Sequence, residues 1–182
     1  QCRLYEDTIT CALRLHLEKE GFAIIKSITE KDEKTIPSMG SSFPEGVEWD
    51  GALYCENENK EEGPILFLIE AKTFLPSNSD CISNMPDRII RTIEFIRLCK
   101  EELLPRATLK EKRKESVNFQ CNMWRAFHSC SVRGVVGTPV MPSSASFETI
   151  KKERYVQVSL KDALYVVVDG EKKERGELCK IE

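Results

Sequence analysis

Three charged residues, Asp50, Glu70 and Lys72, lie in or beside the most apolar part of this sequence. Burying a charge is costly unless the charge is paired or coordinates a metal, so such a group is a candidate functional site. Two carboxylates within a few ångström of each other repel by roughly 4 kcal/mol at an effective dielectric near 20. One would then stay protonated, or a divalent cation would bridge the two. A protonated Lys72 is suited to hold a water molecule or a phosphate oxygen beside that cation.

The order of residues predicts how these groups meet. We expect one strand over Val47–Cys55 and a second over Pro64–Ile69, a nearly unbroken apolar run typical of a central strand. The polar segment between them ends in glycine and has the character of a hairpin loop. Side chains two residues apart on a strand point the same way, so Glu70 and Lys72 share a face. Antiparallel pairing returns Asp50 toward that face.

Each part of this pattern has a plainer interpretation. Asp50-Gly51 is a dipeptide typical of tight turns, although the segment after Cys55 is a better turn. Glu70 and Lys72 would also form an ordinary ion pair at a strand end, worth less than about 1 kcal/mol if exposed.

The combination of Asp50 with Glu70-Ala71-Lys72 one hairpin later resembles the PD-(D/E)XK nuclease superfamily, the fold of many restriction and repair endonucleases. The proline that precedes the aspartate in that family is Trp49 here, and that proline takes no part in the chemistry. The resemblance implies an α/β fold with a restriction-endonuclease-like mixed β-sheet core flanked by helices. Its elements would follow the order αβββαβ, with an extra helix and terminal strands.

The same resemblance implies a metal-dependent nuclease that hydrolyses phosphodiester bonds, with DNA as the substrate ahead of RNA. Asp50, Glu70 and the carbonyl of Ala71 would bind one or two Mg²⁺ ions, or Mn²⁺, because hard cations prefer oxygen ligands. Lys72 would orient or deprotonate the attacking water and stabilise developing charge. No covalent intermediate is required.

Further site residues follow from the family pattern. Members often contribute another acid from the first helix, and Glu6 is the candidate here. The alternative is that Glu6 only stabilises a helix N-terminus. Arg88 and Arg91, on the helix after the Glu-x-Lys strand, would lie near the substrate phosphate or else face solvent.

A narrower resemblance covers three runs of residues, Glu48–Ala52, Ile69–Thr73 and Met85–Thr92. Together they look like nuclease-type C-terminal domains of the Crinkler effectors of oomycetes and fungi. That resemblance implies action on DNA in the nucleus of a host cell. The chief rival is a catalytically inactive nuclease-like module with a binding or regulatory role. A hydrolase of small nucleotides is weaker, since the sequence has no Gly-rich phosphate loop, and an interaction domain of unrelated fold remains.

Chain length, composition and net charge limit the number of domains and the kinds of partner that these hypotheses allow. The chain has 182 residues, of which 41% are hydrophobic and 31% charged, and we expect one domain over residues 1–182. No apolar run approaches the length of a bilayer span, so no membrane association is expected. The net charge of −3 is unfavourable for nucleic-acid binding, although basic residues cluster locally near Arg88, Lys112 and Lys151. Because the chain begins at Gln1, we expect it to be processed or part of a longer protein.

The eight cysteines show no Cys-x-x-Cys pair and no zinc-like spacing with histidine. Several fall in predicted helices and strands. We therefore expect free thiols in a reducing intracellular compartment, with one or two surface disulfides as the alternative.

Periodicity and turn residues predict the remaining elements. Helices are expected over Thr8–Glu20, Asp87–Leu104, Lys112–Cys130 and Ala145–Arg154. Further strands are expected over Phe22–Ile28, Val132–Val140, Tyr155–Val158 and Leu164–Val168, with a loop over Lys31–Gly46 and a turn at Asp169-Gly170.

Overall fold

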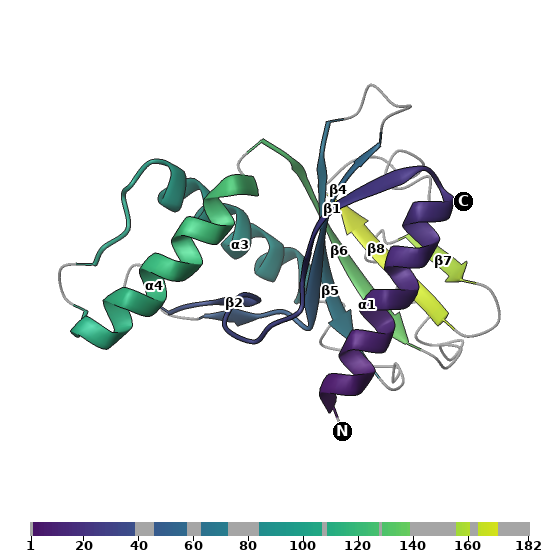
Figure 1. Ribbon diagram of the computed structural model, residues 1–182, viewed down its shortest axis with the longest axis horizontal. Helices are drawn as coiled ribbons and strands as arrows, with labels where there is room; N and C mark the ends of the chain where they lie inside the picture. Colours follow the sequence, from purple (N-terminus) through teal and green to yellow (C-terminus); the bar gives the residue numbers. More distant parts are fainter. Residues whose placement is uncertain are drawn as a thin grey trace.

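The computed structural model describes residues 2–38, 46–57, 63–72, 84–106, 109–127, 129–138, 156–160 and 164–170. Within these ranges the protein is a mixed α/β fold, a mixed sheet flanked by helices (Figure 1). The helices are α1 (Cys2–Lys19), α3 (Met85–Lys100), α4 (Glu111–Trp124) and the short 3₁₀ helix η2 (Arg125–Phe127). The strands are β1 (Phe22–Ile28), β2 (Thr35–Ile36), β3 (Val47–Glu48), β4 (Gly51–Asn57), β5 (Ile65–Ala71), β6 (Ser131–Thr138), β7 (Val156–Leu160) and β8 (Leu164–Gly170).

Six of these strands form one sheet in the order β1-β4-β5-β6-β8-β7, while β2 and β3 pair separately. Within the main sheet, β5 and β6 run parallel and the other neighbours run antiparallel. A parallel pair needs a crossover connection, which α3 and α4 supply here. The central strand β5 is therefore covered on both faces, as its apolar sequence predicts.

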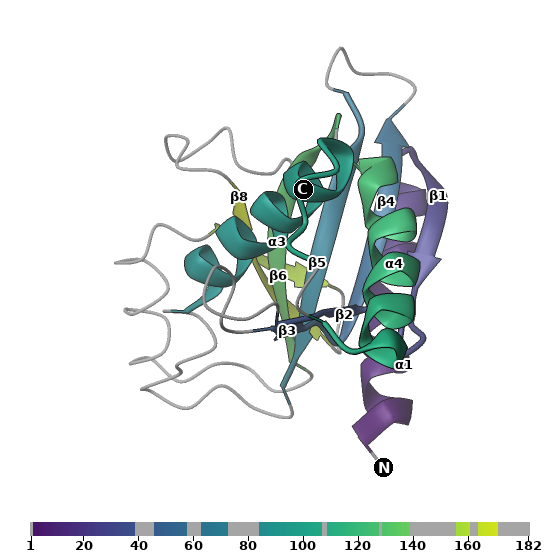
Figure 2. The same ribbon diagram turned by 90° about the vertical axis from the view of Figure 1, so that its left-hand side faces the viewer.

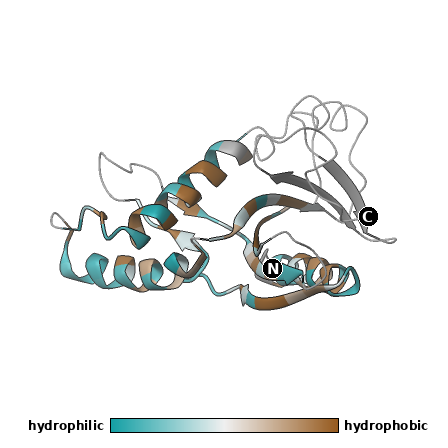
Figure 3. Ribbon diagram, turned by 90° about the horizontal axis from the view of Figure 1, so that it is seen from above, coloured by the Kyte–Doolittle hydropathy of each residue, from teal (hydrophilic) through white to brown (hydrophobic). Residues whose placement is uncertain are grey.

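Helices lie on opposite faces of the sheet (Figures 1 and 2). Helix α1 packs against β1, β4 and β5, whereas α3 and α4 lie on the other side. Alternate residues of β5 contribute to the two cores: Leu66 and Leu68 face α3, and Phe67 and Ile69 face α1. Figure 3 shows hydrophobic bands on α3 and on strands of the sheet, while α4 is mostly hydrophilic. By this alternation Glu70 lies on the side of α3.

Two glycines of β6 allow helices to approach from both faces. A Cβ atom on Gly137 would lie 2.4 Å from Cγ2 of Ile9 in α1, and one on Gly134 would lie 2.6 Å from the sulfur of Met85 in α3. The absence of a side chain at these two positions therefore permits the close approach of α1 and α3 to β6.

Several other predictions agree with the structure. Strand β1 has the predicted bounds, β4 and β5 form the predicted antiparallel hairpin, and the two closing strands are present as β7 and β8. The expected helix over residues 145–154 and its basic residues lie outside the described part of the chain.

Some predicted boundaries are wrong. The strand expected over Val47–Cys55 is broken at Trp49 and Asp50, because β3 pairs with β2 while β4 joins the main sheet. The expected loop over Lys31–Gly46 accordingly contains β2. Asp169 and Gly170 do not form a turn: they continue β8 and pair with Gly134 and Arg133.

The helices differ in extent from the prediction. Helix α1 begins at Cys2 rather than Thr8, so Glu6 lies inside the helix and not at its start. Helix α3 ends at Lys100 rather than Leu104, and α4 gives way to η2 after Trp124. Helical period would place Ile89, Ile93 and Ile96 on one inward face of α3. Ile89 and Ile96 are buried, but Ile93 is 37% exposed.

Candidate functional site

Asp50 occupies the bend between β3 and β4, at the end of the hairpin where β5 finishes. Its backbone N–H donates to the carbonyl of Ile69 at 2.9 Å. Its carboxylate turns back toward the sheet, and Oδ2 accepts a hydrogen bond of 2.6 Å from the backbone N–H of Ala71. The bend therefore aims Asp50 at the end of β5 and not into solvent.

Glu70 is the last buried residue of β5, with an exposed fraction of 8%. Both of its carboxylate oxygens are engaged: Oε1 lies 2.5 Å from Nζ of Lys72, and Oε2 accepts a hydrogen bond of 2.7 Å from Nη1 of Arg88. The structure thus brings Glu70 and Lys72 together on one face, as the strand period predicts. The half-exposed Lys72 also donates its backbone N–H to the carbonyl of Gly137 at 2.8 Å.

Arg88 reaches this site from the first turn of α3. Besides Glu70, its guanidinium donates through Nη2 to the carbonyl of Glu48 at 2.6 Å, and its central carbon lies 4.3 Å from the centre of the Trp49 ring. Stacking of a cation on an indole adds attraction to the two hydrogen bonds. Trp49 is in turn fixed, because its Nε1 donates to Oγ1 of the buried Thr92 at 3.0 Å.

Glu6 meets a residue that the sequence analysis missed. Nζ of Lys34 donates to Oε2 of Glu6 at 2.6 Å and to the carbonyl of Asp50 at 3.2 Å, and Lys34 is only 5% exposed. The ammonium thus links α1 to the bend that carries Asp50. Nothing in the local sequence marks Lys34, since it stands in a polar segment with other charged residues.

The turn before Lys34 is held by α4. Nε2 of Gln120 donates to the carbonyl of Asp32 at 3.2 Å, and Nε1 of Trp124 donates to the carbonyl of Glu33 at 2.8 Å. Helix α4 therefore positions the Lys34 ammonium, although it contributes no side chain of its own to the site.

The start of α1 also reaches β5 directly. The hydroxyl of Tyr5 donates to the backbone carbonyl of Lys72. Glu6, one residue later, faces Lys34 rather than Glu70. The structure therefore brings Glu6 to the border of the site, where its described partner is an ammonium.

The side chains assembled here comprise three carboxylates and three cations, namely Glu6, Asp50, Glu70, Lys34, Lys72 and Arg88. Asp50 has no cation bonded directly to its carboxylate among these ion pairs. The pKa of Asp50 is raised to about 6. Burial is the largest cause and the charges of Glu70 and Glu6 act in the same direction, while the hydrogen bond from the Ala71 N–H and the charge of Lys72 oppose them. Negative charge is least compensated at Asp50.

The oxygen ligands at this end of β5 suit a hard divalent cation. Asp50 and Glu70 would supply carboxylates and Ala71 its carbonyl, and the under-compensated charge on Asp50 favours a cation. Among the described residues no group of three or more histidines, cysteines, aspartates or glutamates is gathered as a metal cluster. A cation would therefore rest on two carboxylates and backbone or water oxygens, and it would compete with Lys72 and Arg88 for Glu70.

A polar pocket of about 340 Å³ adjoins the site at the start of α3. Arg88 and Arg91 both line it, so the structure brings the two arginines to one cavity. Its other lining residues are Gly46, Val47, Glu48, Asn84 and Asp87. The pocket and the carboxylate site share Arg88.

Two other residues of the predicted basic clusters, Arg97 and Lys114, are paired with acids. Arg97 lies 2.7 Å from Glu94 and also bonds Glu101, and Lys114 lies 2.8 Å from Glu111. These exposed pairs neutralise charge on the faces of α3 and α4.

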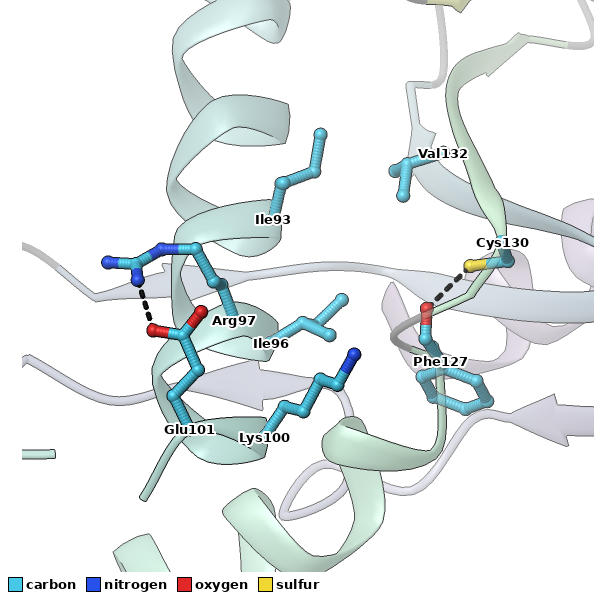
Figure 4. Close-up of a pocket in the computed structure, with 8 residues that line it drawn as sticks. All are labelled: Ile93, Ile96, Arg97, Lys100, Glu101, Phe127, Cys130 and Val132. Atoms are coloured by element: carbon cyan, nitrogen blue, oxygen red, sulfur yellow. Dashed lines mark hydrogen bonds and ion pairs between the residues drawn. The ribbon is translucent and has the colours of Figure 1, made fainter. Parts of the chain in front are cut away.

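A second pocket, of about 250 Å³, lies at the other end of α3 (Figure 4). Its lining is mixed: Ile93, Ile96, Phe127 and Val132 are apolar, while Arg97, Lys100 and Glu101 are charged. Burial raises the pKa of the Cys130 thiol to about 11, and Sγ donates to the carbonyl of Phe127. None of the site residues predicted from sequence lines this pocket.

The structure describes the side chains of five of the eight cysteines, and these five are free thiols: Cys11, Cys55, Cys99, Cys121 and Cys130. None of the described helices combines the length and apolar character needed to cross a bilayer. Comparison with protein-family models, curated proteins and solved structures gives no significant match to this chain.

Proposed function

We propose that this protein is a divalent-metal-dependent nuclease that hydrolyses phosphodiester bonds, with DNA as its substrate. The observation that carries the proposal is the convergence of Asp50, Glu70 and Lys72 at the end of β5, where the Asp50 carboxylate bonds the N–H of Ala71. Charges of both signs in one partly buried corner are costly to assemble, and such groups cluster at functional sites.

The topology also supports the proposal. When β2 and β3, which pair separately, and the helices α4 and η2 are set aside, α1, β1, β4, β5, α3 and β6 come in this order, with three antiparallel strands and a parallel fourth. This is the αβββαβ order that the resemblance to the PD-(D/E)XK superfamily implies, with α4 as the extra helix and β7 and β8 as terminal strands.

Each group has a role in the proposed hydrolysis. Asp50, Glu70 and the carbonyl of Ala71 would hold Mg²⁺ or Mn²⁺, which when bound lowers the pKa of water and stabilises charge on the phosphate. Lys72 orients the attacking water. The water oxygen forms a bond to phosphorus as the bond from phosphorus to the leaving sugar oxygen breaks, and the water proton passes to solvent or to that leaving oxygen.

Arg88 and Arg91 would contact phosphate oxygens from the neighbouring pocket, since guanidinium groups match phosphate geometry. Glu6 holds Lys34, which in turn bonds the backbone of Asp50, so Glu6 acts through the ion pair in this proposal. The proposed setting is a reducing intracellular compartment, and the nucleus of a host cell if the Crinkler resemblance holds.

One observation favours the second candidate, an inactive nuclease-like binding or regulatory module. Both oxygens of Glu70 are already neutralised by Lys72 and Arg88. In such a module these ion pairs would be permanent, and the site would need no cation.

Incubation of supercoiled plasmid, linear DNA and RNA with Mg²⁺, Mn²⁺ or a chelator separates the two candidates. Cleavage should require the metal and fall at least about 100-fold in Asp50→Ala and Lys72→Ala, with folding verified by circular dichroism. Glu18→Ala is the matched control, since Glu18 is an exposed acid that pairs with Arg14 on α1. Binding without cleavage under every condition would favour the inactive module.

A further inference from the structure

Arg88 belongs to two sites at once. Its Nη1 bonds Oε2 of Glu70, a residue of the carboxylate site, at 2.7 Å. The same guanidinium lines the polar pocket that Arg91 also lines. A side chain shared in this way is able to respond to occupation of either site.

A cation on Glu70 would compete directly with Arg88. A divalent ion carries twice the charge of the Arg88 guanidinium, so at a similar distance it attracts the Glu70 carboxylate more strongly. Glu70 has only two carboxylate oxygens, and Lys72 already contacts the other one. A divalent ion on Glu70 therefore weakens the Arg88 ion pair and repels the guanidinium.

The remaining contacts of Arg88 would hold it at the pocket after Glu70 is lost. Nη2 stays within 2.6 Å of the carbonyl of Glu48, itself a pocket residue, and the guanidinium stacks on Trp49. The released Nη1 donors would then need a new acceptor. A phosphate oxygen in the pocket supplies one, because guanidinium groups bond phosphate through charge-assisted hydrogen bonds.

We propose that Arg88 couples cation binding to phosphate binding: it pairs with Glu70 in the cation-free protein and passes to a substrate phosphate when a divalent cation occupies Glu70. This inference rests on the proposed function and adds a regulation of the same site. Linkage makes the coupling reciprocal, so cation and DNA each raise the affinity for the other by the same factor.

The test measures binding rather than cleavage. Mn²⁺ affinity is measured by titration calorimetry at pH 8, and the affinity for a short fluorescent DNA duplex is measured with and without Mn²⁺, with its integrity checked on a gel. In the wild type, Mn²⁺ should raise duplex affinity at least about 5-fold. Arg88→Met should bind Mn²⁺ at least about 5-fold more tightly, because Glu70 is released, and should lose the coupling.

Two further variants serve as controls for the role of Arg88. Arg97→Met removes the same charge from the same helix, but Arg97 pairs with Glu94 and Glu101, so it should keep the wild-type Mn²⁺ affinity and coupling. Arg88→Lys keeps the charge but lacks the planar fork that bridges two acceptors. It should show reduced coupling, and it serves if Arg88→Met melts below the assay temperature.

The outcomes distinguish this inference from the proposed function. If Mn²⁺ binding is present and is abolished by Glu70→Gln, yet Arg88→Met binds no more tightly and keeps the coupling, the role of Arg88 is wrong and the metal site stands. If neither the wild type nor Arg88→Met binds Mn²⁺, both proposals fail. Mn²⁺ binding by Arg88→Met alone would support Arg88 as the group that controls access to Glu70.

Discussion

The carboxylate of Asp50 accepts the backbone N–H of Ala71 at 2.6 Å, while the N–H of Asp50 donates to Ile69 at 2.9 Å. Asp50 is thereby bonded twice to β5, although it lies outside any strand. This arrangement fixes the carboxylate in a partly buried corner. Burial, with Glu70 and Glu6 nearby, raises the pKa of Asp50 to about 6.

A carboxyl whose pKa is higher in the folded than in the unfolded protein is harder to ionise in the folded state. It therefore lowers the stability of the folded protein at pH values where the carboxyl is ionised. The unfolded chain loses this proton near pH 4 and the folded protein near pH 6, so stability falls between these values and the loss persists above them. Asp50→Asn should remove the penalty and keep the hydrogen bond from Ala71. At pH 8 we expect the free energy of unfolding of Asp50→Asn to exceed that of the wild type by about 1 kcal/mol after allowance for solvent screening. This gain corresponds to ~2–4 °C in melting temperature.

Thermal melts of wild type and Asp50→Asn from pH 4 to pH 8 measure this directly. The gap between them should be small at pH 4, open up to about pH 6 and then remain constant. Equal melting temperatures at pH 8 would mean that the Asp50 carboxylate is well solvated in the folded protein. A gap that is as large at pH 4 would mean that the gain does not come from ionisation of Asp50. A stability gain that accompanies lost cleavage is the expected trade-off at a functional site.

The sequence predicts the central sheet well because its strands carry strong local patterns. The apolar run of β5 and the polar loop before it specify the hairpin, and two glycines mark where helices approach β6. The hairpin in turn brings Glu70 and Lys72 onto one face with Asp50 near them. Strand period accounts for the shared face of Glu70 and Lys72, and the hairpin pairing accounts for the nearby Asp50.

The rest of the site depends on tertiary packing that leaves no local pattern. Lys34 meets Glu6 across 28 residues of sequence, because α4 holds the turn before it. The break at Asp50 arises because β3 pairs with β2, a two-residue strand too short to predict. Helical periodicity also overestimates the buried face of α3, since it does not show that Ile93 lies at the edge of the covered stripe.

The buried ion pair of Lys34 and Glu6 should be important for stability. Lys34→Met leaves the Glu6 carboxylate mostly buried and unpaired, so we expect a loss of about 3 kcal/mol in the free energy of unfolding. The double variant Glu6→Gln with Lys34→Met removes both charges and should lose less. Urea denaturation measures each value.

The exposed pair of Arg14 and Glu18 provides the control for this ion pair. Their side chains are 49% and 39% exposed and 3.0 Å apart, so Arg14→Met should cost less than about 1 kcal/mol. Equal losses in Lys34→Met and Arg14→Met would contradict the buried role of Lys34.

The buried hydroxyl of Thr92 should be needed to hold Trp49 beneath Arg88. It accepts the indole N–H of Trp49 at 3.0 Å and donates to the carbonyl of Arg88 at 2.9 Å. Thr92→Val keeps the shape but leaves the indole N–H unsatisfied, at an expected cost of about 1–3 kcal/mol. Urea denaturation of the variant gives the cost.

A double-mutant cycle identifies the source of that cost. Thr92→Val should be less damaging in Trp49→Phe, which has no indole N–H to satisfy, than in the wild type. The indole of Trp124 bonds the carbonyl of Glu33 and not Thr92. The cost of Thr92→Val should therefore be the same in a Trp124→Phe background as in the wild type. If the cost of Thr92→Val is the same in all three backgrounds, the bond to Trp49 contributes nothing.

Gly137 and Gly134 should differ in their tolerance of alanine, although both are crowded. A Cβ on Gly137 meets Cγ2 of Ile9 at 2.4 Å, an atom attached to the stiff, branched Cβ of that side chain. A Cβ on Gly134 meets the sulfur of Met85 and Cδ1 of Ile89, the far ends of side chains that can move aside. Gly137→Ala should therefore cost about 1–3 kcal/mol and Gly134→Ala less.

Shortening Ile9 tests the steric origin of the Gly137 effect. Ile9→Ala alone removes core contacts and should cost about 2–5 kcal/mol. In the double variant, the methyl group that Gly137→Ala introduces occupies space that Ile9 has vacated. The double variant should therefore lose less free energy of unfolding than the sum of the losses of the two single variants. Strict additivity in urea denaturation would show that Gly137→Ala acts on the backbone of β6, and that α1 does not depend on this glycine to reach the sheet.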